Sequence, residues 1–315
     1  MTTPADPAPL LATASAALPS ALPGANTLVA LAACVLFGLT AGVVGTFAVA
    51  RRRALLADVA GHATLAGVSL AFLAGEATGL GGRTPWLLSL GAFAAALAAA
   101  LAAPRLARIP RLGADGANAV LLSLGFGAGV ALLSVVQSDP SGAQGGLRRL
   151  LFGSAATTTR ADLAALAVLS AAALATTALL FRGLSAIAFD ELHARVAGLP
   201  VARLDLVLVA LVVAAVVAGM QVAGVVLVVA MLITPAVAAR QRGGPIPRLV
   251  VRAALLGAGS AAAGVALSLA LSLPTGAAMT LSATALFAGS LVASRVLPRR
   301  TGPVRTAESA RAGAR

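Results

Sequence analysis

Runs of apolar residues recur along almost the whole chain, and they constrain its fold more than any other feature of the sequence. Most are about 17–25 residues long, which is the length an α-helix needs to cross a lipid bilayer. Nine such runs follow one another, at residues 27–50, 59–78, 86–103, 117–136, 161–181, 204–219, 221–239, 250–273 and 277–297. Because the apolar character barely dips around residues 219–221, eight spans is the alternative count.

The composition excludes a soluble fold for these 315 residues. Hydrophobic residues make up 59% of the chain and charged residues only 10%, whereas a soluble globular protein has about 25% charged residues. The mean hydropathy is +0.98, so too few polar side chains are present to cover a surface that faces water. We therefore expect an all-α fold, a polytopic bundle of transmembrane helices in the cytoplasmic membrane.

Two terminal segments flank the predicted transmembrane domain, which covers residues 27–297. Residues 1–26 contain five prolines and a single charged residue, Asp6, and lack the basic start and unbroken apolar stretch of a signal peptide. We expect a flexible N-terminal segment that is not cleaved. Residues 298–315 carry five arginines and predict a basic cytoplasmic tail.

Arginine supplies all 23 basic residues, because the sequence contains no lysine. With the N-terminus outside and nine spans, 19 arginines fall on the inner side of the membrane and four, Arg83, Arg148, Arg149 and Arg160, on the outer side. This bias follows the positive-inside rule. Because the arginines interrupt apolar runs and aromatic residues are only 3% of the chain, the net charge of +13 does not indicate a nucleic-acid partner.

Enzyme signatures are missing from the sequence. A P-loop needs a lysine that reaches the nucleotide phosphates, so this chain has no ATPase site of that kind. The H-E-x-x-H and G-x-S-x-G patterns of metalloproteases and serine hydrolases are also absent. The single cysteine, Cys34, lies in an apolar run and predicts packing rather than chemistry. We expect neither enzymatic activity nor a permanently bound cofactor.

An acid and a histidine stand four residues apart in the second apolar segment, at Asp58 and His62. This spacing places both side chains on one face of a helix, with Leu65 and Ser69 continuing the same stripe. A carboxylate and an imidazole together suit a divalent transition metal, and ionisable residues inside a membrane are expensive unless they serve a function. The structural alternative is that Asp58 caps the helix and His62 bonds to a backbone carbonyl.

A short helix is predicted in the loop that follows the fifth span. Asp190 is a suitable N-cap, Gly198 suits the position after the helix, and Pro200 prevents its continuation. Leu192 and Val196 share one face of this helix. Since it lies on the arginine-rich side, we expect it to contact a cytoplasmic partner; the alternative is a solvated connector. His193 is interpreted as a surface residue.

The sequence resembles the membrane-permease subunits of ABC importers for zinc and manganese. The first matching segment, 51–67, begins with three arginines and contains Asp58, His62 and Gly67. Further matches, in order and spacing, cover residues 151–154, 189–205, 221–240 and 273–276. Together they extend over nearly the whole membrane region, from about residue 50 to residue 297.

The resemblance implies an importer-type permease for zinc or manganese, with iron as a further candidate cargo. It implies a homodimer around a central pathway, a separate cytoplasmic ATPase that binds the ATP, and an extracytoplasmic solute-binding protein that delivers the metal. Asp58 and His62 match the residues that line the family's pathway. The segment that matches the ATPase-coupling loop contains Phe189, Asp190, Glu191, Leu192, Arg195, Gly198, Leu199 and Pro200.

Met220, Gln221 and Pro235 are further candidates for the lining of the pathway, since few and weak ligands suit a metal in transit. Three alternatives to a metal permease stay open at this point. They are a permease for iron-siderophore complexes or cobalamin, an ion-coupled carrier in which Asp58 takes the proton, and a membrane scaffold without transport.

Overall fold

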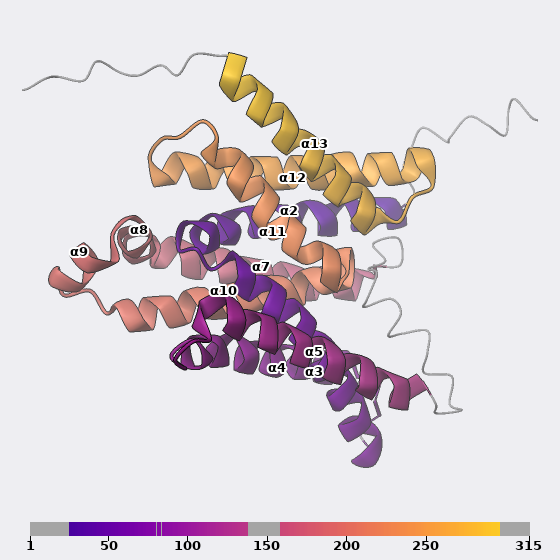
Figure 1. Ribbon diagram of the computed structural model, residues 1–315. Coiled ribbons are helices and arrows are strands. Elements are labelled where there is room, and N and C mark those ends of the chain that lie inside the picture. The colour runs from indigo at the N-terminus through magenta and orange to yellow at the C-terminus, as the bar shows by residue number, and fades with distance from the viewer. Residues whose placement is uncertain (1–24, 80, 83, 138–157, 297–315) are drawn as a thin grey trace, which may run out of the picture.

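The computed structural model describes residues 25–79, 81–82, 84–137 and 158–296. Within these ranges every regular element is a helix (Figure 1), as the composition predicts. The predicted N-terminal segment, apart from residues 25 and 26, lies outside the described residues. The predicted basic tail and the motif at 151–154 lie outside them as well.

Eleven helices make up the described chain, and each predicted span corresponds to one of them. In order they are α2 (Ala25–Ala50), α3 (Ala54–Ala77), α4 (Pro85–Leu106), α5 (Gly113–Gln137), α7 (Arg160–Leu179), α8 (Phe181–Phe189), α9 (Glu191–Val196), α10 (Val201–Ala223), α11 (Val225–Arg240), α12 (Ile246–Leu271) and α13 (Thr275–Val296).

Eight of these helices are long and apolar enough to cross a membrane, namely α2, α3, α4, α5, α7, α10, α12 and α13. The ninth apolar helix, α11, has 16 residues, or about 24 Å at 1.5 Å per residue, whereas the hydrocarbon layer is about 30 Å thick. Although it is short, α11 runs back toward the end of the bundle where α8 and α9 lie (Figure 1). The described chain therefore begins at one end of the bundle and finishes at the other.

The break between the sixth and seventh spans lies at Gly224, so its predicted place around residues 219–221 is wrong. Gly224 has φ 83° and ψ 154°, a conformation that glycine adopts most readily. Gly219 instead lies within α10, where a Cβ would lie 2.2 Å from the Phe37 ring. Glycine at that position makes room for a neighbouring helix and does not end its own.

Helices α3 and α10 lie at the centre of the bundle. In their most apolar stretches 72% of the residues are buried, against 22% for α4, α5 and α7. Glycines set the closest helix crossings, as their four-residue spacing indicates. A Cβ at Gly38 of α2 would lie 2.3 Å from the Gly257 oxygen of α12, and one at Gly125 of α5 would lie 3.1 Å from the Ala63 nitrogen of α3.

The arginine-rich connections meet at one end of the bundle, as the charge bias predicts. A cavity of about 660 Å³ there is lined by the end of α2, the start of α3, the end of α4, the start of α5 and the end of α8. At the opposite end, Gln221 Nε2 of α10 lies 3.5 Å from Ser89 Oγ of α4. The helices thus run back and forth between two ends of the bundle. Together with the eight candidate spans, this makes the chain a multi-pass membrane protein.

Candidate functional site

Asp58 and His62 form a loosely joined pair on α3. Four residues separate them, so they lie one turn apart on the same face, and His62 Nε2 is 3.5 Å from Asp58 Oδ1. The side chains are 21% exposed for His62 and 37% exposed for Asp58. Nearly all of their neighbours on α3 are buried, so the pair marks an opening in an otherwise packed helix.

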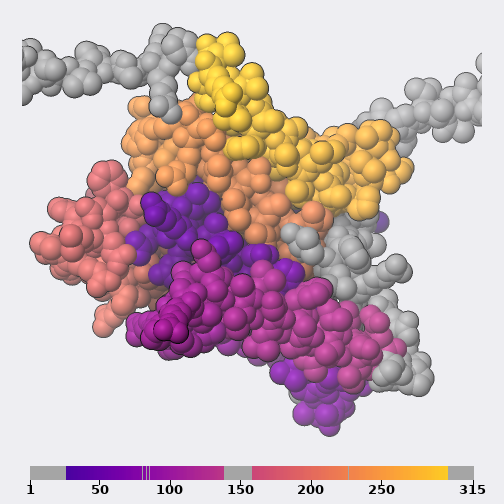
Figure 2. All heavy atoms as spheres, in the orientation of Figure 1, coloured from indigo at the N-terminus to yellow at the C-terminus, as the bar shows by residue number. Residues whose placement is uncertain are grey.

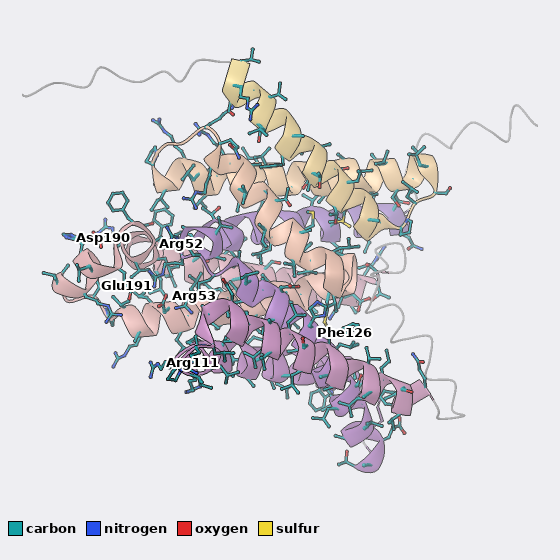
Figure 3. The ribbon with its side chains drawn as sticks, in the orientation of Figure 1. Arg52, Arg53, Arg111, Phe126, Asp190 and Glu191 are labelled. Carbon is teal, nitrogen blue, oxygen red and sulfur yellow. The ribbon has the colours of Figure 1, made fainter. Side chains whose placement is uncertain are left out.

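Phe126 of α5 packs against His62, a contact that the sequence analysis missed. The two rings meet edge to face, with centroids 5.4 Å apart and planes at 90°. Gly125 explains how α5 comes this close, since a Cβ there would lie 3.3 Å from the His62 carbonyl carbon. Phe126 is itself 50% exposed and lies along the bundle, well away from the α9 end (Figure 3). The only local signal of the contact between Phe126 and His62 in the sequence is that a glycine, Gly125, directly precedes the phenylalanine.

A carboxylate and an imidazole are both side chains of kinds that bind transition metals. Among the described residues, no group of three or more His, Cys, Asp or Glu side chains could hold a metal ion. Zinc and manganese take four or more ligands in most protein sites. One copy of this chain therefore offers an incomplete coordination shell at Asp58 and His62.

The three additional lining candidates lie in different surroundings. Met220 is 1% exposed and belongs to the hydrophobic core. Gln221 is half-buried and contacts Ser89, while Pro235 is buried within α11. The break that follows Gln221 brings the start of α11 against α3, where a Cβ at Gly61 would lie 3.6 Å from Val225. Their role in a pathway stays a prediction.

The predicted short helix is α9, and its ends are capped as expected. The Asp190 carboxylate accepts hydrogen bonds from the Leu192 and His193 backbone amides, at 2.9 and 3.1 Å. Gly198 has φ 76°. Its amide bonds to the Arg195 carbonyl and that of Leu199 to the Ala194 carbonyl, both at 3.0 Å, which is the Schellman pattern. Six residues of helix are thereby held at both ends.

Three large apolar side chains project from α9 and from the end of α8 into the surroundings. Phe189 is 87% exposed, Leu192 72% and Val196 82%, whereas Ala194 on the opposite side is fully buried. Figure 2 shows α8 and α9 as a projection at one end of the molecule. Exposed apolar groups that are rimmed by charged residues mark sites of protein association.

Arg51 ties this element to the rest of the bundle, and sequence reasoning did not find that tie. Its guanidinium donates to both Asp205 carboxylate oxygens at 3.0 Å, to Glu191 Oε2 at 3.0 Å and to the Ile187 carbonyl at 3.0 Å. Arg53 adds a bond to Asp205 Oδ2 at 3.1 Å. Figure 3 places Arg52, Arg53, Asp190 and Glu191 together at this end.

The contacts among Arg51, Arg195, Glu191 and Asp205, called the Arg51 network below, favour the charged forms of Arg51 and Glu191. Partial burial lowers the pKa of Arg51, but the hydrogen bonds and charges of Asp205 and Glu191 outweigh that effect and raise its pKa above the ordinary value. The hydrogen bond from Arg195, followed by that from Arg51, lowers the pKa of Glu191 below its usual value. The only available signal in the sequence is that Glu191 and Asp205 are two of just ten acids.

Comparison with known proteins covers most of the chain. A model of the ABC 3 transport family matches residues 25–294. The manganese transport system membrane protein MntC of Bacillus subtilis (strain 168) is 37% identical over 268 residues, which are 85% of this chain and 60% of that protein. This chain thus spans less than two thirds of that relative. The zinc transport system membrane protein TroC of Treponema pallidum (strain Nichols) is 34% identical over 231 residues, 73% of this chain and 76% of that protein.

A solved structure has the same architecture. It is PsaBC from Streptococcus pneumoniae in complex with Fab, which superimposes with a TM-score of 0.73 at 28% sequence identity. The match covers 83% of this chain and 89% of the other chain. The helical arrangement described above is therefore shared with this solved structure over most of both lengths.

Proposed function

The chain belongs to the ABC 3 transport family, and on that premise we propose that it is the permease subunit of an importer for a divalent transition metal, manganese or zinc. The pair of Asp58 and His62 carries this proposal, because a carboxylate and an imidazole on one helix face are ligands for such ions. The names of the relatives MntC and TroC, a manganese and a zinc transport protein, support the same class of cargo.

The looseness of the pair suits a site of passage. Its one polar contact spans 3.5 Å and both side chains are partly exposed, so the oxygen and nitrogen atoms keep the capacity to bind an ion. A conducting site must bind its ion firmly enough to admit it and weakly enough to release it. Asp58 and His62 provide that weak binding within the membrane region.

A second copy of the chain completes the coordination shell in this proposal. Homodimers with two-fold symmetry present the same surface from both subunits, so two copies facing each other would bring together two carboxylates and two imidazoles. The exposed side of Phe126, next to His62, would then lie at the interface. The pathway would run between the two copies.

Energy comes from a separate ATPase subunit that binds at α9. The chain has no lysine for a P-loop, and Phe189, Leu192 and Val196 offer an exposed apolar surface on the arginine-rich end. Binding and hydrolysis of ATP in that partner would move α9 and rock the helices between outward-open and inward-open states. A solute-binding protein would deliver the metal at the opposite end.

The test is the content of manganese, zinc and iron in cells that lack the gene, grown in metal-poor medium. We expect a selective fall in manganese or zinc that the wild-type gene restores. Asp58→Ala should fail to restore it while still co-purifying with the ATPase. The matched control is Asp115→Ala, which removes an exposed acid from the first turn of α5 and should restore uptake.

Two outcomes would contradict the proposal. Full restoration of metal content by Asp58→Ala would exclude the pathway role of that carboxylate. No change in any of the three metals, in a strain without a redundant importer, would favour a permease for iron-siderophore complexes or cobalamin, whose large cargo needs no intramembrane carboxylate and imidazole.

A further inference from the structure

The Arg51 side chain joins α9, the proposed docking element for the ATPase, to α3, the helix that carries Asp58 and His62. Arg51 lies in the turn between α2 and α3, with its backbone amide bonded to the Phe47 carbonyl at 2.9 Å. Its side chain leaves that turn and contacts three later elements, at Ile187 of α8, Glu191 of α9 and Asp205 of α10. Only 11% of the side chain is exposed.

The strength of this junction comes from its geometry. Arg51 donates through Nε to Asp205 Oδ1 at 3.2 Å and through one terminal nitrogen to both carboxylate oxygens, so the guanidinium plane is fixed by more than one bond. Such multiple, charge-assisted bonds are shorter and stronger than neutral ones and define an orientation. A lysine at this position would keep the charge and lose the planar fork.

The turn that bears Arg51 continues directly into α3. The helix begins at Ala54, and Asp58 and His62 lie within its first nine residues, which is less than about 14 Å along the axis at 1.5 Å per residue. Arg53 anchors the same turn a second time through Asp205. A displacement of α9 therefore reaches the start of α3 through side chains that are held at both ends.

The surroundings leave room for that displacement. The cavity of about 660 Å³ is lined by Arg51 and Glu191 of the Arg51 network and by Arg53, and also by Pro104, Ala107 and Asn118 from the end of α4 and the start of α5. Open space therefore borders the network at this end of the bundle.

We propose that Arg51 is the positioning residue that couples the ATPase-docking helix α9 to the metal-binding helix α3. Its bonds to Glu191 and Asp205 make α9, the start of α10 and the start of α3 move as one unit when the ATPase changes shape. This inference rests on the proposed function, since it needs both a docked ATPase and a metal at Asp58 and His62.

The experiment measures metal transported per ATP hydrolysed, with the permease, its ATPase and its solute-binding protein reconstituted in proteoliposomes and Mn²⁺ or Zn²⁺ as the probe. Arg51→Gln should still bind the ATPase, because Phe189, Leu192 and Val196 are unchanged, and ATP hydrolysis should continue. We expect metal moved per ATP to fall at least tenfold, with Arg51→Lys intermediate. Arg52→Gln is the matched control, because Arg52 is the exposed neighbour in the same turn, and its ratio should equal that of the wild type.

A second variant covers the case in which Arg51→Gln does not fold. Glu191→Gln removes the negative charge and so weakens the bond from Arg51 to α9, while the bonds between Arg51 and Asp205 are kept. The bundle then stays tied while α9 is held less firmly. Its ratio of metal to ATP should fall about threefold or more.

Three results would decide against the proposal. A wild-type ratio in both Arg51→Gln and Glu191→Gln would overturn the role of Arg51. If the variants lost ATPase binding but the complexes that remained moved a normal amount of metal per ATP, Arg51 would only hold the docking surface in place and would not couple α9 to α3. A wild-type complex that hydrolyses ATP and moves neither metal would instead overturn the proposed function itself.

Discussion

Two clusters of ionisable residues lie within a short stretch of α3 and the turn before it, and they are built in opposite ways. Asp58 and His62 share one polar contact of 3.5 Å and stay partly open to their surroundings. Arg51 is 11% exposed and donates to two carboxylates and a carbonyl. In the proposed mechanism, the groups that bind a passing ion are left incompletely satisfied, while the groups that transmit a movement are satisfied within the chain.

The comparison extends to what each cluster contributes to stability. A partly exposed ion pair is worth about 0–1 kcal/mol, and we expect the 3.5 Å contact between Asp58 and His62 to contribute no more than that to the stability of the fold. Removal of one partner from a more deeply buried pair costs about 3–5 kcal/mol, because the remaining charge is left uncompensated. The Arg51 network lies between these limits, since Asp205 is 19% and Glu191 39% exposed.

The largest effect that separates the clusters is expected for His62→Ala. Metal uptake should fall to the background of the deletion strain, because half of the ligand pair is gone. The melting temperature of the purified permease should change by no more than about 2–4 °C, the shift that a loss of 1 kcal/mol produces in a domain of about 150–250 residues. Uptake assays and thermal melts on the same preparation test this contrast. A large loss of stability would make His62 a structural residue.

An intermediate effect is expected at the contact between α5 and α3. Gly125→Val should push α5 away from Ala63 and shift Phe126 from His62, since even a Cβ would lie 3.1 Å from the Ala63 nitrogen. We expect uptake to fall about tenfold, with binding of the ATPase unchanged, because α9 is not involved. Gly127→Val is the control in the same helix, where an added Cβ meets no atom within 4 Å. Equal uptake by the two variants would show that the close approach of α5 to α3 at Gly125 does not affect metal uptake.

The smallest effect is expected for the cap of the docking helix. Asp190→Ala removes two hydrogen bonds at the start of α9, and loss of an N-cap costs about 1 kcal/mol. Recovery of the ATPase in co-purification should fall about threefold to fivefold, as α9 frays and its apolar face is less often presented. Thr159→Ala removes the N-cap of α7, whose hydroxyl accepts a hydrogen bond from the Asp162 amide at 3.1 Å, and its recovery should match the wild type. The same loss in both variants would point to a general loss of stability instead.

Local signals in the sequence were sufficient for the apolar helices and for the bounds of α9, but they did not reveal α8. The apolar runs predicted the place of each apolar helix to within a few residues, because a helix in lipid must satisfy its own backbone hydrogen bonds and needs about 20 apolar residues to cross. One of the nine predicted spans, α11, is shorter than the eight candidate spans. The ends of α9 followed from Asp190 and Gly198, whose effects act within a single turn. The four-residue spacing of Asp58 and His62 placed them on one face for the same reason.

Long-range contacts could not be predicted in this way. Arg51 lies 140 residues from Glu191 and 154 residues from Asp205, and no periodic pattern connects positions so far apart. The break at Gly224 was misplaced by a few residues because Gly219 makes room for Phe37 of α2, which the sequence of α10 alone does not reveal.

The sequence by itself determined that this protein is a helical membrane protein with its arginines gathered at one end, a capped helix at that end and an acid–histidine pair nearby. Only the tertiary structure decided which of the ionisable groups are joined to one another. The physical reason is range: backbone hydrogen bonding, capping and hydrophobicity act on neighbours in the chain, whereas the partners of Arg51 and His62 are brought close by the packing of the helices that carry them.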